Sequence, residues 1–157
     1  MSSPKDLFVE KVVVNIGVGE AGERLVKAEK VLEMVTGQKP VETLSKTVNR
    51  DLGIREGMPL GCKVTLRGER MYEFMDKLMN IALPRVRDFH GVPRNSFDNQ
   101  GNYSLGLKEQ TVFPEITFED ASVLHGLEIT FIIKNGSKEG STKLLELFGM
   151  PFEKGDK

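Results

Sequence analysis

The sequence has little cysteine, no tryptophan and no long apolar run. Its one cysteine, Cys62, excludes an internal disulfide and any zinc site built from several cysteines. The apolar run that begins at Val12 ends at Asn15, and no segment approaches the roughly 18 apolar residues that a membrane span needs. Residues 1–6 include an acid and lead into no apolar segment, so a secretory signal is not expected. These absences predict a soluble protein of the cell interior that makes no membrane contact.

The length and composition are those of an ordinary globular protein. The chain has 157 residues, of which 39% are hydrophobic and 29% charged. Domains usually contain about 100–200 residues, so we expect one domain over residues 1–157, with a core that needs no covalent staple. The same composition excludes a disordered, collagen-like or coiled-coil chain.

Neither sign of charge is in clear excess, but the charge is unevenly distributed along the chain. The chain contains 22 basic and 23 acidic residues, a net charge of −1, which by itself argues against a nucleic-acid-binding protein. Residues 39–87, however, contain ten Lys or Arg and six Asp or Glu, a net charge of +4. The remainder contains 12 and 17, a net charge of −5. Only one face of a protein needs to be basic to hold a phosphate backbone, so residues 39–87 are the candidate segment for contact with a nucleic acid.

Hydrophobic periodicity predicts an alternation of strands and helices. Residues that alternate between apolar and polar predict strands at Glu10–Ile16, Lys39–Leu44, Cys62–Arg67, Leu105–Gln110 and Gly126–Lys134. Apolar residues spaced three or four apart predict helices at about 22–36, at about 69–83 and at Ser137–Phe148. Long connections are expected at 45–60 and 89–103. This order predicts an α+β fold in two layers, with helices on one side of a mostly antiparallel sheet.

A glycine-rich segment after the first predicted strand raises the possibility of a nucleotide site. Gly17, Gly19 and Gly22 match the spacing of a dinucleotide-binding turn, and Glu42 follows at a suitable distance. Asn15 interrupts a strand that such a fold would bury on both faces, and the chain lacks the second half of that fold. The alternatives are a simple turn and a close backbone approach to another phosphate, such as that of RNA.

Two further features are candidates for RNA contact. Lys63, Thr65 and Arg67 project from one side of their predicted strand, and Asn15 would join them if the two strands are neighbours. An exposed basic sheet face with hydrogen-bonding side chains is one way in which proteins meet RNA, although a merely solvated outer face fits the same pattern. The connection 45–60 is long enough to reach a polyanion or to be an ordinary surface loop.

Signals for catalysis or metal binding are weak. His90 and His125 do not form a pair with metal-ligand spacing, and no serine lies in a nucleophile-elbow motif. Cys62 alternates with apolar residues, which is typical of a small core residue. Glu115, Glu119 and Asp120 lack the spacing of a calcium loop. We therefore expect no enzyme, no metal and no cofactor.

Five segments, taken in order, resemble one protein family. The longest runs from Ile54 to Gly68, and the others are Lys11–Gly19, Thr36–Pro40, Asn80–Phe89 and Gly101–Ile116. Together they are similar to the universal L5 family of large-subunit ribosomal proteins, and the resemblance covers roughly residues 10–151. Five ordered segments are far more specific than one short motif.

The resemblance implies a non-catalytic role in the cytoplasmic ribosome. It implies a domain in the central protuberance, with an open sheet face that holds 5S rRNA and a long loop that extends toward the peptidyl-site tRNA and large-subunit rRNA. Other loops would form a bridge to a protein of the small-subunit head. The implied 5S rRNA surface consists of Asn15, Gln38, Lys39, Thr43, Lys63, Thr65 and Arg67, and the implied loop cations are Lys46, Arg50 and Arg55. The alternatives are a free-standing RNA-binding regulator and a nucleotide-binding module that uses the Gly17–Gly22 turn.

Overall fold

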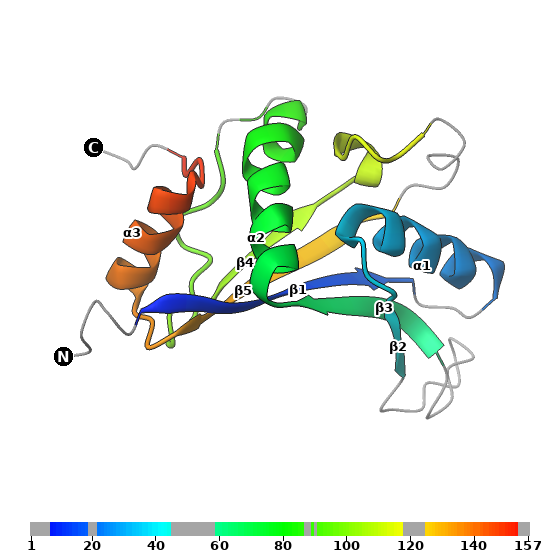
Figure 1. The fold of residues 1–157 in the computed structure, drawn as a ribbon, viewed down its shortest axis with the longest axis horizontal. Coiled ribbons are helices and arrows are strands. Elements are labelled where there is room, and N and C mark those ends of the chain that lie inside the picture. Colours follow the sequence, from blue (N-terminus) through cyan, green and yellow to red (C-terminus); the bar gives the residue numbers. More distant parts are fainter. Residues whose placement is uncertain are drawn as a thin grey trace.

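A central antiparallel sheet organises the chain (Figure 1). The computed structural model describes residues 7–18, 22–44, 59–86, 89, 91–117 and 125–153. Within these residues the strands are β1 (Phe8–Gly17), β2 (Val41–Leu44), β3 (Pro59–Leu66), β4 (Tyr103–Leu107) and β5 (Leu127–Lys134). The α-helices are α1 (Glu23–Thr36), α2 (Gly68–Lys77) and α3 (Lys138–Phe148). Shorter helical turns cover Leu78–Ala82, Leu83–Arg85 and Gln110–Val112.

The strand order is β2-β3-β1-β5-β4, and every neighbouring pair is antiparallel. The apolar strand β1 lies at the centre, where Val14 pairs with Val64 of β3 on one side and with Ile129 of β5 on the other. A dinucleotide-binding fold needs parallel strands joined through a helix. Because β1 and β2 are not neighbours and the pairs in the described sheet are antiparallel, the nucleotide-binding alternative is wrong.

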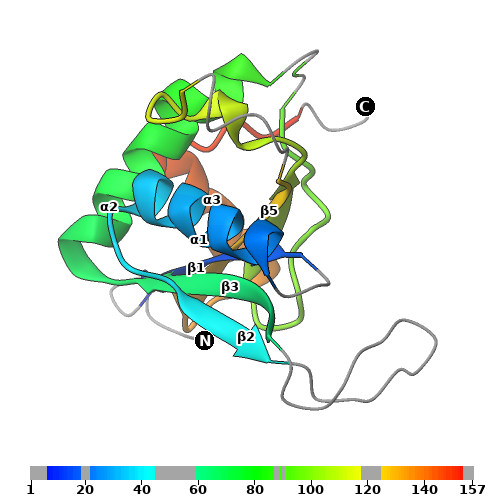
Figure 2. The same ribbon diagram turned by 90° about the vertical axis from the view of Figure 1, so that its right-hand side faces the viewer.

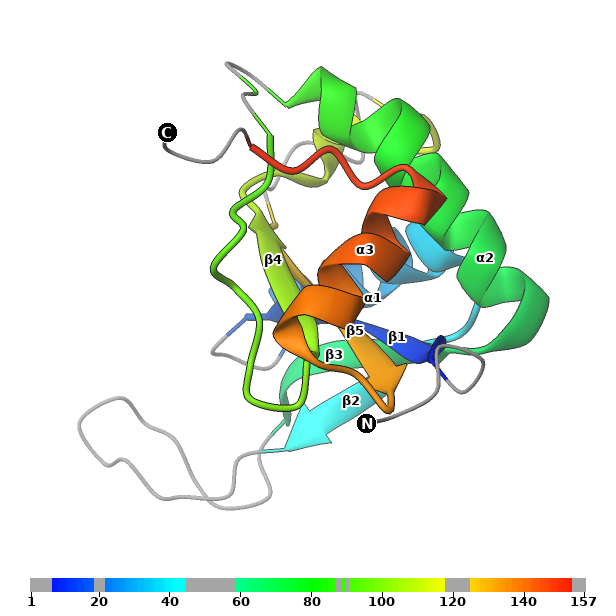
Figure 3. The same cartoon turned by 90° about the vertical axis from the view of Figure 1, so that its left-hand side faces the viewer.

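The three α-helices lie on one side of the sheet (Figures 2 and 3). Alternate strand residues point toward them and are buried: Val12, Val14, Ile16, Cys62, Val64, Leu66, Leu127, Ile129, Phe131, Ile133, Tyr103, Leu105 and Leu107. The other face of the sheet is not covered by these helices. The predicted fold class, an α+β fold with an open antiparallel sheet, is confirmed.

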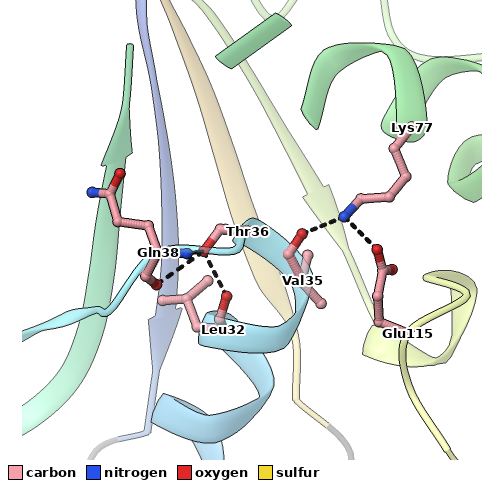
Figure 4. A network of polar contacts seen from close by, with 6 residues as sticks. All are labelled: Leu32, Val35, Thr36, Gln38, Lys77 and Glu115. Carbon is pink, nitrogen blue, oxygen red and sulfur yellow. Dashed lines mark hydrogen bonds and ion pairs between the residues drawn. The ribbon is translucent and has the colours of Figure 1, made fainter. Parts of the chain in front are cut away.

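A polar cluster ties the helical layer together (Figure 4). The Lys77 ammonium on α2 donates to the Val35 carbonyl in the last turn of α1 and pairs with the Glu115 carboxylate at 2.7 Å. A cation is favoured at this end of a helix because the last carbonyls lack partners within the helix. Thr36 donates to the Leu32 carbonyl at 2.7 Å. The cluster fixes the end of α1, from which the chain continues to β2.

The second helix differs most from its predicted form. The sequence predicts one helix over about 69–83, but the regular α-helix ends at Lys77 and continues as a π-helical turn and a 3₁₀ turn up to Arg85. Pro84 explains the change. It has no N–H to donate to the carbonyl four residues earlier, and its ring crowds that carbonyl, so the turn there widens.

Several predicted boundaries also shift. The strand predicted at Leu105–Gln110 is β4, which spans Tyr103–Leu107, and Gln110 lies fully buried in a 3₁₀ turn. The connection predicted at 45–60 is too long at its end, because β3 already begins at Pro59. The strand predicted from Lys39 begins at Val41. These errors arise where pairing with a distant strand, rather than local alternation, decides where a strand begins and ends.

Candidate nucleic-acid interface

The uncovered side of the sheet, which we call the open face, is built from the alternate residues of the five strands. Side chains in a strand point to opposite faces in turn, so the residues between the buried ones share this side. In the centre of the sheet the open face comprises Val13, Asn15 and Gly17 of β1, Gly61, Lys63 and Thr65 of β3, and Glu128 and Thr130 of β5. Val41 and Thr43 of β2, and Ser104 and Gly106 of β4, complete it at the edges.

One row across the open face carries opposite charges on either side of an amide. Asn15 pairs in register with Lys63 on β3 and with Glu128 on β5. Lys63 and Glu128 are both exposed, and Asn15 between them is half-buried. The β3 side of the face therefore attracts phosphates, and the β5 side repels them.

A second row is polar but uncharged. Val13 pairs with Thr65 on β3 and with Thr130 on β5, and Thr130 pairs with Ser104 on β4. The Ser104 and Thr130 hydroxyls are hydrogen-bonded at 3.2 Å. Short hydroxyl side chains around a central valine give a shallow surface on which ribose hydroxyls and bases can lie.

Asn15 has an unused hydrogen-bond acceptor. Its Oδ1 atom is buried, and no donor in the described part of the chain reaches it. Buried polar atoms are nearly always paired, so an unpaired one calls for an explanation. Because the atom is buried, a donor on the open face, such as a ribose 2′-hydroxyl or a base amino group, could supply the missing bond only if the Asn15 amide turned outward.

The sequence-predicted site residues fall into two sets. Asn15, Lys63 and Thr65 lie together at the centre of the open face, and Thr43 lies beside them opposite Gly61. The exposed Arg67 follows β3 in extended conformation, so its alternation with Lys63 and Thr65 continues the same face. Gln38 and Lys39 lie at the margin instead.

Gln38 has a structural role at that margin. Its Nε2 atom donates to the Thr65 carbonyl at 3.1 Å, and its Oε1 atom accepts from Arg70 at 3.4 Å. The pairing of β2 with β3 extends only as far as Lys63, so Gln38 satisfies the β3 carbonyl that lies beyond it. The amide thus secures the edge of the open face.

Lys39 is exposed just before β2, and its charge acts on the Glu29 carboxyl of α1. Burial raises the pKa of the Glu29 carboxyl on α1, the neighbouring Glu42 raises it further, and Lys39 lowers it in part. Glu42 pairs with the buried Cys62 and therefore belongs to the helical side of the sheet. This effect on Glu29 is electrostatic, and among the described residues Lys39 forms no ion pair.

The predicted loop cations Lys46, Arg50 and Arg55 lie outside the described residues. Sequence reasoning missed the contribution of β5 and β4, which supply Glu128, Thr130, Ser104 and Gly106 to the open face. The alternation of Glu128 and Thr130 with buried residues was a usable signal. That alternation could not predict that β5 lies next to β1, because local alternation does not specify strand order.

The remaining polar candidates that the structure describes show no catalytic arrangement, and His90, Glu119 and Asp120 lie outside the described residues. His125 is buried, and burial, followed by the charges of Arg24 and Lys27, lowers its pKa. Burial raises the pKa of the Cys62 thiol to about 12. In the described ranges, no three His, Cys, Asp or Glu side chains are placed to hold a metal ion, and no helix is long and apolar enough to cross a membrane.

An open antiparallel sheet with a polar, partly cationic face and helices on the other side is the architecture of many α+β RNA-binding proteins. The chain matches the sequence model of ribosomal protein L5 over residues 4–55 and that of the C-terminus of the ribosomal L5 family over residues 59–152. Among similar proteins are those called large ribosomal subunit protein uL5. The protein from Thermoanaerobacter sp. (strain X514) is 57% identical over 98% of this chain and 86% of its own.

Two other relatives with the same name agree. The protein from Natranaerobius thermophilus is 54% identical, covering 97% of this chain and 85% of its own, and that from Alkaliphilus oremlandii is 52% identical, covering 98% and 86%. The chain therefore belongs to the ribosomal protein L5 family. Membership confirms the predictions of a large-subunit ribosomal protein that binds RNA in translation, that is located in the cytoplasmic ribosome and that is not an enzyme.

Proposed function

We propose that this chain binds 5S rRNA on the open face and helps to attach it in the central protuberance of the large subunit. The observation that carries the proposal is the cluster of Lys63, Asn15 and Thr65 at the centre of an uncovered sheet face, in a chain of the L5 family. The proposal treats residues 1–157 as one 5S rRNA-binding domain. In its support, strands from both family-model segments alternate in a single described sheet.

The chemistry of the open face suits structured RNA. Lys63 and Arg67 supply cations for phosphates on the β3 side. Asn15, Thr43 and Thr65 supply short hydrogen-bonding groups, which suit ribose hydroxyls and base edges better than they suit charges. Gln38 is hydrogen-bonded within the protein, so we assign it the role of shaping the edge of the site, and the exposed Lys39 stays a proposed RNA contact at that edge.

Further partners remain part of the proposal. The connection between β2 and β3, with Lys46, Arg50 and Arg55, would reach toward the peptidyl-site tRNA and large-subunit rRNA. Another surface would form the bridge with a small-subunit head protein. Family membership supports a ribosomal partner with rRNA, and the resemblance of the five segments supports these finer assignments.

The experiment is a filter-binding titration of 5S rRNA at several salt concentrations. Replacing Lys63 or Arg67 with Ala should weaken binding and reduce the slope of log K against log salt by about one unit each, because one phosphate contact is lost. Lys143→Ala, an exposed charge on α3 on the opposite side of the molecule, is the matched control and should keep the wild-type slope.

Thr65→Val tests the uncharged part of the face. The substitution keeps the shape and removes the hydroxyl, so affinity should fall by about 1–3 kcal/mol if an RNA group is left unpaired, with little change in the salt slope. Wild-type affinity and slope in the Lys63, Arg67 and Thr65 variants would show that the open face is merely solvated, and would overturn the proposal.

A further inference from the structure

A pocket at the β4 edge of the sheet has the chemistry of a second RNA phosphate site. The pocket measures about 570 Å³ and lies between the turn that ends at Arg85 and the end of β4. Its walls include Arg85, Gly106, Lys108, Glu109 and Thr111. It lies apart from Lys63 and Arg67, because β4 and β3 are separated by β5 and β1.

The two cations of this pocket are available for a ligand. Arg85 and Lys108 are exposed, and neither forms an ion pair or hydrogen bond with another residue in the part of the chain that the structure describes. The one acid in the wall, Glu109, accepts a hydrogen bond from Thr111 at 3.0 Å. The wall thus contains two cations and one carboxylate, a net charge of +1, which favours an anion, although the exposed Glu128 pairs with Gly106 and lies beside the pocket.

The backbone adds a donor. On β4 the Ser104 N–H points away from β5 and donates to the Ser96 carbonyl. Residues two apart in a strand have the same orientation, so the Gly106 N–H also points away from β5, at the sheet edge where Gly106 lines the pocket. A glycine there leaves space for a close approach, since a Cβ added at Gly106 would have no neighbour nearer than 4.0 Å.

A strip of backbone without side chains joins this pocket to the open face. Gly61 pairs with Gly17, and continuing the β1–β5 register beyond Asn15 and Glu128 places Gly126 on the other side of Gly17. A Cβ added at Gly126 would lie 3.8 Å from the Lys108 carbonyl. The exposed part of this path crosses β1 and β5 and ends beside Lys108, whereas Gly61 on β3 is buried beside the Thr43 hydroxyl. At Gly17 and Gly126 no side chain stands between a ligand and the sheet.

Gly17 has no need to be glycine in the free protein. Its φ is not in the left-handed region, and a Cβ added there would have nothing within 4 Å. Glycine weakens a strand, so its presence at an exposed position with free space around it is better explained by a molecule that approaches the backbone closely. Gly61, by contrast, is required by its neighbours, because its Cβ would lie 2.5 Å from the Ile16 carbonyl oxygen.

We propose that the pocket formed by Arg85, Lys108 and the Gly106 N–H binds a phosphate of 5S rRNA that crosses the sheet over the exposed Gly17 and Gly126. The inference rests on the proposed binding of 5S rRNA to the open face and adds a second anchoring point at the opposite edge. The two anchors flank Glu128, where a phosphate would be repelled.

The test is the salt dependence of 5S rRNA binding. Arg85→Ala and Lys108→Ala should each reduce the slope of log K against log salt by about one unit, and the double variant by about two. Lys138→Ala and Lys143→Ala on α3 should leave it unchanged. Gly17→Val should lower affinity about tenfold without lowering the melting temperature, because the added side chain blocks the path and not the fold.

A directed-cleavage experiment gives an independent readout. The only native cysteine is buried, so an iron chelate attached through Lys108→Cys would be placed selectively. It should cut 5S rRNA in the complex, whereas the same chelate attached through Lys143→Cys should not. Wild-type slopes in both pocket variants, or wild-type affinity in Gly17→Val, would overturn this inference even where Lys63→Ala lowers the slope. Failure of wild-type protein to bind 5S rRNA would overturn the proposed function as well.

Discussion

Lys77→Met should destabilise the protein more than any loss of a surface lysine. The Lys77 ammonium bonds the Val35 carbonyl, pairs with Glu115 and lies 5.9 and 5.8 Å from the ring centroids of Phe74 and Phe113. Its side chain is only 20% exposed. Methionine preserves the packing of the stem and removes the charge.

The expected loss is roughly 2–5 kcal/mol. A hydrogen bond from a charged donor contributes about 1.5–3 kcal/mol, and cation–π contacts at partly exposed sites contribute about 0.5–1 kcal/mol. The pair with Glu115 adds up to about 1 kcal/mol, because Glu115 is 34% exposed and solvent screens the interaction. For a protein of this size, each kcal/mol shifts the melting temperature by about 2–4 °C, so the shift should be roughly 4–20 °C.

The assay is urea and thermal unfolding followed by circular dichroism. Glu115→Gln is the partial control, since it removes the ion pair and leaves the bond to Val35, and it should cost about 1 kcal/mol or less. Lys143→Met, on the exposed side of α3, should be nearly neutral. If Lys77→Met unfolds within about 1 °C of the wild type, the reasoning about the cluster is refuted.

Three further outcomes follow from the sheet. Gly61→Ala should cost about 1–3 kcal/mol in urea unfolding, because its Cβ would lie 2.5 Å from the Ile16 carbonyl oxygen; a neutral result would show that β3 can shift at little cost. Glu128→Gln should raise the affinity for 5S rRNA several-fold at low salt, because it removes one negative charge that repels the RNA phosphates. Weaker binding would instead indicate that Glu128 accepts a hydrogen bond from the RNA. Burial, followed by the charges of Glu29 and Glu42, raises the pKa of the Cys62 thiol from 9.0 to about 12. The thiolate therefore forms at lower pH in the unfolded chain than in the folded protein, so the free energy of unfolding should fall as the pH rises from about 9 toward 12. At about pH 8 the native thiol should resist alkylation, and fast alkylation of the folded protein would contradict this.

Local pattern accounts for much of the fold. The alternation in β1, β3 and β5 predicted which side chains are buried, because strand side chains alternate between faces whatever the partner strand is. The spacing of Leu25, Ala28 and Val35 likewise predicted the buried side of α1. Family resemblance, carried by five ordered segments, predicted RNA binding.

The residues of each strand and helix thus determine by themselves which of its sides is apolar and which is polar, including the polar side of β3 that carries Lys63 and Thr65. Packing between distant segments makes β5 and β4 continue the open face, and it lets Lys77 join α1 to Glu115. It also aligns Gly17 with Gly61 and brings Arg85 to Lys108. The difference arises because periodicity is a property of neighbours in sequence. Strand order and register depend on how the apolar faces of distant segments pack together, and the sequence of a single segment does not determine that packing.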